Sequence, residues 1–220
     1  MRHDGTVERE GRGAQTRKKV LAAALAVVQE RPLAEVQLQH IAARAGISAG
    51  HVLYHFGSKD RILVETLRWS EESIARDRVR NLSELSDPAA ALGRWIVLFL
   101  PRDQDDPTWK LWLELWLRST MDEESREIPR GVSERWISDL ERILEDGLER
   151  GTFSDVDKEA FMTWAHSLLV GVSIGVLAGW LTLEHAQRIA VRSIAKEIGC
   201  SIPLAADEAS EGQVAEAPPA

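Results

Sequence analysis

The stretch AGISAGHVLYHFGSKDRIL, residues 45–63, decides the fold that the sequence predicts for the first part of the chain. It closes a helical pattern whose apolar face consists of Leu38, Ile41, Ala42 and Ala45. Gly46 suits the left-handed backbone with which many helices end. Ser48 can then cap a short second helix that ends near Phe56, and Ser58 can open a third helix. Two short helices joined by a glycine-containing turn predict a helix-turn-helix, which places its second helix in the major groove of DNA.

The charge of the chain is unevenly distributed, in agreement with a DNA-binding N-terminal part. The net charge is -8 over 220 residues, but residues 1–80 carry 14 Lys and Arg against 10 Asp and Glu. The other 140 residues carry 13 against 25. A basic module joined to an acidic remainder suggests that only the first part approaches a polyanion, although chance alone can give such counts.

Helical periodicity continues through the rest of the chain, and no segment alternates with the period of two that β-strands show. We therefore predict an all-α protein. It would have a flexible tail at 1–13, a three-helix DNA-binding domain at 14–75, a larger effector-binding and dimerisation domain at 76–200 and a disordered tail at 201–220. The helix-turn-helix is expected at about 37–56, with Thr16 as the cap of the first helix. Further helices are expected over 87–100, 106–122, 133–151, 157–183 and 184–199.

In these residues the chain resembles the tetracycline-repressor (TetR) family of bacterial transcription regulators. The resemblance covers roughly residues 14–75 and rests on the first amphipathic helix, on IAARAGIS with Gly46, on Gly50, on the aromatic Phe56 and on Lys59. Less specifically, residues 109–175 resemble the C-terminal domain of the choline-responsive, betaine-pathway repressors of that family, through LWLELWLRS, W...L..IL..GLERGTF and a glycine-rich helix. The resemblance implies a homodimer that binds an operator in double-stranded DNA, and it makes a cationic amine an admissible effector.

The resemblance also implies which side chains face DNA. Recognition-helix residues would meet bases and phosphates, and the lysine of the following helix would meet the backbone. Hydroxyl, imidazole, phenol and ammonium groups are donors that phosphate oxygens accept, and helix N-termini add amide donors. The positions carried over in this way are Gln37, Ser48, Ala49, Gly50, His51, Tyr54, His55 and Lys59.

Two positions depart from the family pattern. Most members carry Tyr where this chain has Leu53, and here the Tyr follows one residue later as Tyr54; helix 2 often begins with Thr where this chain has Gln37. A shift of one residue moves the phenol by about 100° around the helix. We therefore expect Leu53 to pack in the small core under the first helix. Tyr54 is expected either to contact a base or phosphate or to be a core aromatic, and Phe56 to be core.

The sequence predicts no catalytic, metal or cofactor site. It holds no P-loop, dinucleotide-binding glycine motif, GxSxG, HExxH or paired-carboxylate motif, so we expect no enzyme. His51 and His55 lie four residues apart, but no acid or Cys nearby completes a metal site. The single Cys, Cys200, excludes an intramolecular disulfide, and without an apolar N-terminal signal we expect a cytoplasmic protein.

Eight Trp against one Tyr is an unusual ratio. Trp109, Trp112 and Trp116 lie at i, i+3 and i+7 on one helical face, and further aromatic residues, Trp95, Phe99, Trp136 and Trp164, lie on neighbouring helices. Such rings either form hydrophobic core or line an effector pocket, where their faces can hold a cationic amine or a lipophilic compound. The spacing alone leaves both interpretations open.

The segment SLLVGVSIGVLAGWLTL, residues 167–183, has no charged residue. It is slightly short for a membrane span and has charged neighbours on both sides. Gly171, Gly175 and Gly179 follow each other at i, i+4 and i+8, a spacing that lets two helices approach closely. We expect them in a dimer interface or a tightly packed core, and we expect no membrane insertion.

Together these patterns predict a one-component transcriptional regulator, most simply a repressor. An effector bound in the C-terminal domain would favour a conformation whose two recognition helices no longer match a palindromic operator. Two alternatives remain open at the level of sequence: an activator of the same fold, and a ligand-binding protein whose DNA-binding module is degenerate.

Overall fold

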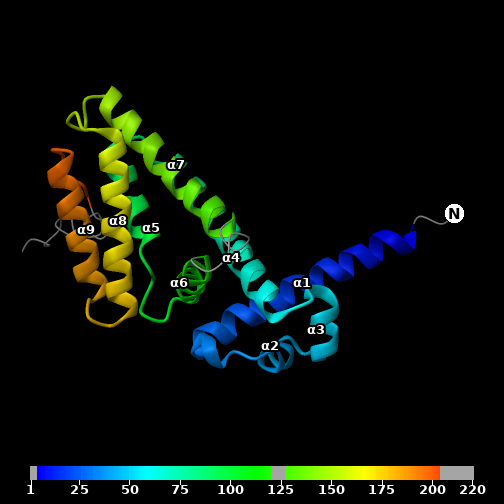
Figure 1. The fold of residues 1–220 in the computed structure, drawn as a ribbon. Helices are drawn as coiled ribbons and strands as arrows, with labels where there is room; N and C mark the ends of the chain where they lie inside the picture. The colour runs from blue at the N-terminus through cyan, green and yellow to red at the C-terminus, as the bar shows by residue number, and fades with distance from the viewer. Residues whose placement is uncertain (1–3, 120–126, 204–220) are drawn as a thin grey trace, which may run out of the picture. The chain divides into compact units, whose positions relative to one another are not determined.

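The computed structural model describes residues 4–119 and 127–203, and within them it confirms the all-α prediction (Figure 1). The described part holds α-helices and one short 3-10 helix, with no strand. Its residues form two compact units, which are described separately below. Unit 1 holds the described residues up to Ile74 and from Asp105 to Val132, and unit 2 holds Ala75–Gln104 and the described residues from Ser133 onward.

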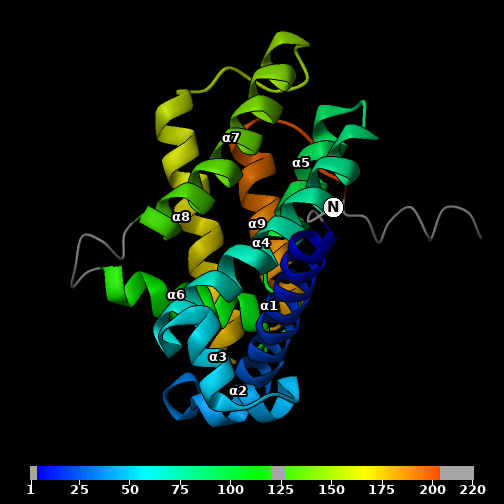
Figure 2. The same cartoon turned by 90° about the vertical axis from the view of Figure 1, so that its right-hand side faces the viewer.

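Unit 1 contains the helix-turn-helix. Its elements are α1 (Asp4–Glu30), η1 (Leu33–Glu35), α2 (Leu38–Ala45), α3 (Ala49–Phe56), the first part of α4 (Lys59–Ser83), α6 (Pro107–Ser119) and the start of α7 (Glu127–Glu149). α2 contacts both α1 and α3, and the two views show α2 and α3 on one side of α1 (Figure 2). The buried side chains of this small core include Val20, Ala24, Val28, Ile41, Val52, Phe56, Ile62 and Leu67.

The first helix is longer than the sequence pattern predicted. α1 begins at Asp4, so Thr16 lies inside the helix and is not its N-cap, and the expected tail at 1–13 is helical from Asp4. No proline occurs before Pro32, and the polar segment therefore contains nothing that must end a helix. Its glycines each cost about 1 kcal/mol of helix propensity and are tolerated here. The expected C-terminal tail lies, from residue 204 on, outside the described residues.

Unit 2 is built from the end of α4, α5 (Pro88–Phe99), most of α7, α8 (Lys158–Leu177) and α9 (Leu183–Glu197). α8 and α9 lie side by side, and α5 contacts α9 (Figure 1). Local caps fix where these helices begin: Asp157 accepts a hydrogen bond from the amide of Ala160, and Thr182 accepts one from His185. The core between the helices includes Leu92, Trp95, Ile96, Leu140, Leu144 and Leu169.

Helix α6 belongs to unit 1, although the sequence suggested one continuous domain over 76–200. The reason is its packing against α4 and α1. The hydroxyls of Ser70 and Thr108 are 2.6 Å apart, and the indole Nε1 of Trp112 donates to Glu71 Oε1 at 2.7 Å. α6 also contacts α1. Because of these long-range contacts, which local sequence does not encode, α6 packs in unit 1 although it follows α5 of unit 2 in the sequence.

The apolar helix α8 ends earlier than the uncharged segment does. It stops at Leu177, and Gly179 has a left-handed φ of 76°, so the three glycines do not share one helical face. A Cβ at Gly175 would lie 2.6 Å from Leu181 Cδ1, which makes Gly175 a close-approach position within the chain. Of the described helices, α8 is long and apolar enough to span a membrane, yet a helix buried in a protein core passes the same test.

Candidate nucleic-acid interface and effector sites

The turn between α2 and α3 has the geometry that the sequence predicted. Gly46 has a φ of 64° and its amide donates to the carbonyls at the end of α2. Ile47 donates to Ala42 O at 3.1 Å, which completes the C-terminal cap. Ser48 Oγ accepts from the amide of His51 at 3.2 Å and caps α3. The start of α3 is therefore fixed by the backbone of α2 and by one hydroxyl.

The burial of side chains along α3 corrects the prediction for Leu53 and decides between the two predictions for Tyr54. Val52 is fully buried and Phe56 is 1% exposed, whereas Leu53 is 42% exposed and Tyr54 84% exposed. The assignment of Leu53 to the core is therefore wrong. Val52 and Phe56, one helical turn apart, form the buried face, and Leu53 lies about 100° away from it. Tyr54 is not a core aromatic but the most exposed large side chain of the helix.

The outer face of α3 carries a continuous row of polar aromatic rings. The imidazoles of His51 and His55 are stacked with centroids 5.0 Å apart, and the phenol of Tyr54 meets His55 edge-on at 5.4 Å. Gly50 is exposed, and a Cβ there would meet nothing within 4 Å. The structure thus places Gly50, His51 and Tyr54 on the accessible side of α3, whereas Ala49 and His55 are half-buried. Within the described residues no group of His, Cys, Asp or Glu forms a metal cluster.

Lys59 and Gln37, predicted to contact phosphates, both have structural contacts. Lys59 Nζ donates to the carbonyl of Val36 at 3.0 Å, which ties the start of α4 to the segment before α2. An ammonium group has three N–H donors, so this bond leaves two. Gln37 is exposed at the N-terminus of α2, and its backbone amide donates to Nδ1 of His40 at 3.2 Å. His40, which the helical pattern suggested to be only a surface residue on the solvated side of this helix, accepts this hydrogen bond and thereby caps α2.

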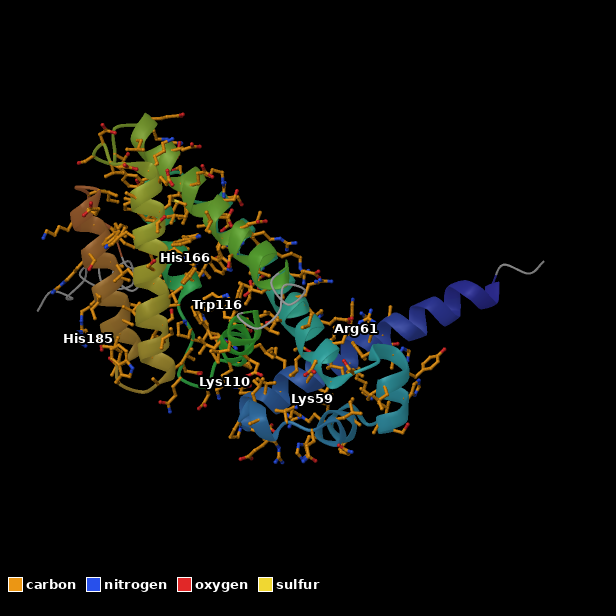
Figure 3. The ribbon with its side chains drawn as sticks, in the orientation of Figure 1. Lys59, Arg61, Lys110, Trp116, His166 and His185 are labelled. Carbon is orange, nitrogen blue, oxygen red and sulfur yellow. The ribbon has the colours of Figure 1, made fainter. Side chains whose placement is uncertain are left out.

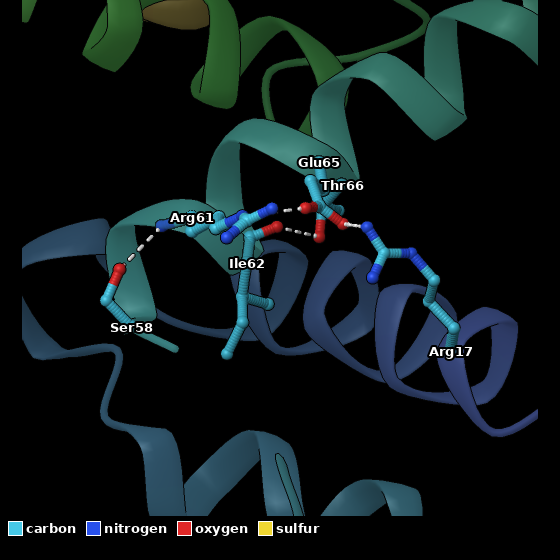
Figure 4. Close-up of polar contacts among 6 residues, drawn as sticks. All are labelled: Arg17, Ser58, Arg61, Ile62, Glu65 and Thr66. Atoms are coloured by element: carbon cyan, nitrogen blue, oxygen red, sulfur yellow. Dashed lines mark hydrogen bonds and ion pairs between the residues drawn. The ribbon is translucent and has the colours of Figure 1, made fainter. Parts of the chain in front are cut away.

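An ion-pair network centred on the nearly buried carboxylate of Glu65 joins α1 to α4 (Figure 4). Glu65 accepts from Arg17 and, at 3.2 Å, from Arg61 Nε, while the Arg61 amide donates to Ser58 Oγ at 3.1 Å. The guanidinium of Arg17 also lies over the ring of Phe56, 4.8 Å from its centroid. Arg17 thus links the buried end of the recognition helix to α4. Sequence reasoning missed this pair, because 48 positions separate its members.

Unit 1 contains an aromatic cluster made of Trp109, Trp112 and Trp116, called here the unit-1 cluster. The Trp116 ring lies 5.1 Å from Trp112 and 6.3 Å from Trp109. Figure 3 shows Trp116 on α6. Beside the cluster, Glu71 is only 4% exposed and accepts the indole N–H of Trp112. The buried ionic group next to these rings is therefore a carboxylate.

Unit 2 contains a second cluster made of Trp95, Phe99 and Trp136, called here the unit-2 cluster. Its ring centroids are 5.2 to 6.0 Å apart. The guanidinium of Arg78, 2% exposed, lies 3.9 Å from the centroid of Trp136 and donates to Asp139 at 2.5 Å. His166 meets Phe99 edge-on at 5.7 Å, and burial lowers the pKa of its imidazole below 6.5 (Figure 3). The buried ionic group next to these rings is a cation.

The aromatic residues proposed from the sequence as one pocket are thus distributed over both units. Trp164, on α8, is 38% exposed, and its ring lies 6.0 Å from Phe161. Unit 2 also contains a cavity of about 280 Å³ whose walls carry none of the tryptophans. Its lining residues are Leu82, Leu85, Pro88, Ala91, Arg142, Ile143 and Asp146.

Comparison with known proteins agrees with both parts of this architecture. Residues 20–66 match the family model described as bacterial regulatory proteins, tetR family. Residues 88–199 match the model described as BetI-type transcriptional repressor, C-terminal. This chain belongs to the TetR family. Its TetR-type helix-turn-helix lies in unit 1, and the BetI-type region includes the whole of α5, α6, α7, α8 and α9, of which α6 belongs to unit 1.

Curated relatives of this TetR-family chain include the HTH-type transcriptional regulator BetI of Agrobacterium fabrum, 32% identical over 125 residues, which cover 56% of this chain and 61% of the relative. BetI 2 of Chromohalobacter salexigens is 35% identical over 106 residues, which cover 47% of this chain and 51% of the relative. The chain therefore matches between half and two thirds of the length of these relatives.

Solved structures of transcriptional regulators share the fold over most of the chain. A transcriptional regulator from Saccharomonospora viridis, solved in complex with choline, has a TM-score of 0.77 and 26% identity, and the match covers 83% of this chain and 96% of that one. FadR from Bacillus subtilis, solved with stearoyl-CoA, has a TM-score of 0.67 and 16% identity over 82% of this chain and 97% of that one. At that identity the second likeness concerns the fold alone.

Proposed function

We propose that this chain is a cytoplasmic transcriptional repressor that binds a palindromic operator as a homodimer and releases it when a small-molecule effector binds. The observation that carries the proposal is the row of His51, Tyr54 and the half-buried His55 on a short helix whose start is fixed by Gly46 and Ser48. A TetR-type helix-turn-helix with this accessible polar face has the chemistry that base edges and phosphates require.

Within the proposed interface the side chains have different tasks. The N-terminal amides of α3 and the remaining N–H donors of Lys59 suit phosphate oxygens. The side-chain amide of Gln37 can donate to a phosphate in the same way. His51 and Tyr54 extend from the exposed face and suit base edges. Ala49 and Gly50 keep the first turn of α3 small, which lets the backbone approach the duplex.

A mobility-shift assay with the DNA upstream of the gene tests this proposal. We expect the purified protein to prefer that DNA over random DNA of equal length, with an affinity that falls steeply as salt rises. His51→Ala is expected to weaken specific binding about tenfold through the loss of a base contact, whereas Gln29→Ala, an exposed change on α1, leaves it unchanged. A wild-type protein without preference for its upstream DNA would refute the proposal.

The proposed dimer uses α8 and α9, of which α8 presents apolar side chains to solvent in the single chain. Ile174 is 39% exposed on α8, and a Cβ at Gly171 would meet nothing within 4 Å. A second copy covering this face would pair two recognition helices at one helical turn of DNA. In sedimentation velocity we expect a dimer for the wild type and for Val79→Glu, an exposed position on α4. Ile174→Glu should give a monomer, and a dimer in that variant would exclude this interface.

The proposed effector is a cationic amine bound at the unit-1 cluster. Rings of Trp109, Trp112 and Trp116 together with the buried carboxylate of Glu71 offer both the π-faces and the negative charge that stabilise a quaternary ammonium group. The relative from Saccharomonospora viridis, whose structure contains choline, supports choline as the first compound to test.

A further inference from the structure

Three buried side-chain atoms among the described residues of unit 2 have no hydrogen-bond partner; one is the Ser173 hydroxyl, and the other two are N–H donors beside the unit-2 cluster. Within the described part of the chain, Nη1 of Arg78 and Nε1 of Trp95 have no hydrogen-bond partner, although Trp95 is 0% and Arg78 2% exposed. Both residues contact Trp136: the guanidinium lies over its ring, and the Trp95 ring meets it edge-on at 6.0 Å. Donors removed from water without an acceptor are unfavourable, and they are rare in folded proteins. Two of them beside one ring indicate a missing oxygen acceptor.

A cation does not fit beside these donors. The face of Trp136 that an ammonium group would use is occupied by Arg78, 3.9 Å from the ring centroid. Arg142 donates to Asp139 at 3.2 Å, so that two guanidinium groups share this one carboxylate. Arg142 is 63% exposed, so the buried charge beside the cluster is the guanidinium of Arg78, which favours a ligand of negative over one of positive charge.

We propose that the unit-2 cluster binds a small organic carboxylate with an aromatic or apolar body, a second effector chemistry distinct from the cationic one. One carboxylate oxygen would accept from Arg78 Nη1 and the other from Trp95 Nε1, while the rings of Phe99 and Trp136 cover the body of the ligand. This inference rests on the proposed function only where it calls the ligand an effector. Binding of the carboxylate to the site does not depend on DNA binding.

His166 adds a second way to detect such a ligand. Its imidazole lies against Phe99, and burial lowers its pKa, so the ring is neutral at pH 7. A carboxylate bound at the cluster would favour the protonated ring and raise that pKa. The competing explanation for the two donors is ordered water, which would satisfy them equally in all solutions.

The test is a titration of the full-length protein followed by NMR of its tryptophan indole N–H groups, without DNA. The probes are sodium benzoate and sodium phenylacetate, with benzamide and benzyltrimethylammonium as neutral and cationic counterparts. We expect both acids to move the Trp95 indole signal, identified by its loss in Trp95→Phe, and to raise the pKa of His166. Benzyltrimethylammonium should not move that signal, and benzamide should bind at least tenfold more weakly than the acids.

Variants separate the site from general effects on folding. Trp95→Phe removes one donor while keeping an aromatic ring, and should weaken binding of the acids about tenfold. Arg78→Lys keeps the positive charge but loses the planar N–H donors of the guanidinium, and should weaken binding of the acids further. Trp180→Phe, at an exposed tryptophan of the same unit, should bind like the wild type. If neither acid moves the Trp95 signal, or if the neutral and cationic probes move it equally, the donors are hydrated and the proposal is wrong. Failure of the protein to bind its operator would leave this readout intact.

Discussion

The two aromatic clusters have similar ring content but buried ionic partners of opposite sign. In unit 1, Glu71 lies beside Trp112 and accepts its indole N–H. In unit 2, Arg78 lies over Trp136, and the indole N–H of Trp95 has no partner within the described residues. Aromatic rings alone bind many apolar ligands with little selectivity, so the charged group decides which ligand is favoured. A row of tryptophans therefore does not define a ligand class until its buried ionic neighbour is known.

The comparison also concerns how each cluster is held. The indole of Trp112 is fixed by a hydrogen bond to a carboxylate, whereas Trp95 is fixed by packing alone. The cation of unit 2 is in turn fixed by Asp139, which is 17% exposed. Each cluster thus has a polar contact to a buried ionic group, and removing that contact should reveal how much it contributes.

The largest expected effect comes from separating the ion pair of unit 2. Asp139→Asn leaves the guanidinium of Arg78 buried without its carboxylate, which should lower the free energy of unfolding by about 3 kcal/mol. Asp146→Asn removes the partner of Arg150 at an exposed ion pair and should change it by less than about 0.5 kcal/mol. Urea denaturation measures both. Equal effects of the two substitutions would mean that the cation of unit 2 does not need Asp139.

A smaller effect is expected when the two indoles are compared directly. Trp112→Phe leaves the buried Glu71 carboxylate without that donor, whereas Trp95→Phe breaks no hydrogen bond within the described residues. Both substitutions remove a similar volume, so the difference between them reports the hydrogen bond. We expect Trp112→Phe to be more destabilising by about 1–2 kcal/mol in thermal or urea unfolding. If Trp95→Phe proved equally costly, its N–H would have an acceptor in solution, such as ordered water.

The smallest effect is a pH dependence confined to unit 2. Burial lowers the pKa of His166 below the 6.5 of an exposed imidazole, so at mildly acid pH the unfolded chain binds more protons than the folded one. The contribution of the neutral ring to stability is therefore complete above pH 6.5 and is lost as the pH falls through the folded pKa. Melting curves at pH 7.5 and 5.5 should show a smaller loss for His166→Gln than for the wild type. His185→Gln, at an exposed position of α9, is the matched control and should lose as much as the wild type.

The turn and the helix starts of the helix-turn-helix could be predicted because their signals are local. Gly46 and Ser48 act on the backbone within three or four positions of themselves, and the structure confirms both caps. Leu53 was misplaced because apolar character was read without the phase of the helix: Val52 and Phe56 already fill the buried face. A position one residue from a buried one lies on a different side of the helix, whatever its side chain.

The effector sites could be predicted only in part, since spacing identified the tryptophans but not their partners. Glu71 and Arg78 lie on α4, which shows no special pattern at either position, and they meet residues 41 and 58 positions later in the chain. The same holds for α6, whose contacts with α1 and α4 join it to unit 1. Charge pairing over such distances depends on tertiary packing, and a single sequence carries no local sign of it.

The most direct test of the central claim is a choline titration of the protein–operator complex in the wild type, Glu71→Gln and Glu72→Gln. Gln at position 71 keeps an acceptor for the Trp112 indole but removes the charge, and Glu72 is the exposed neighbour on α4. We predict that choline releases DNA from the wild type and from Glu72→Gln at the same concentration, while Glu71→Gln needs about tenfold more or does not respond. Release of Glu71→Gln at the wild-type concentration, or no release of the wild type by choline, would contradict the account.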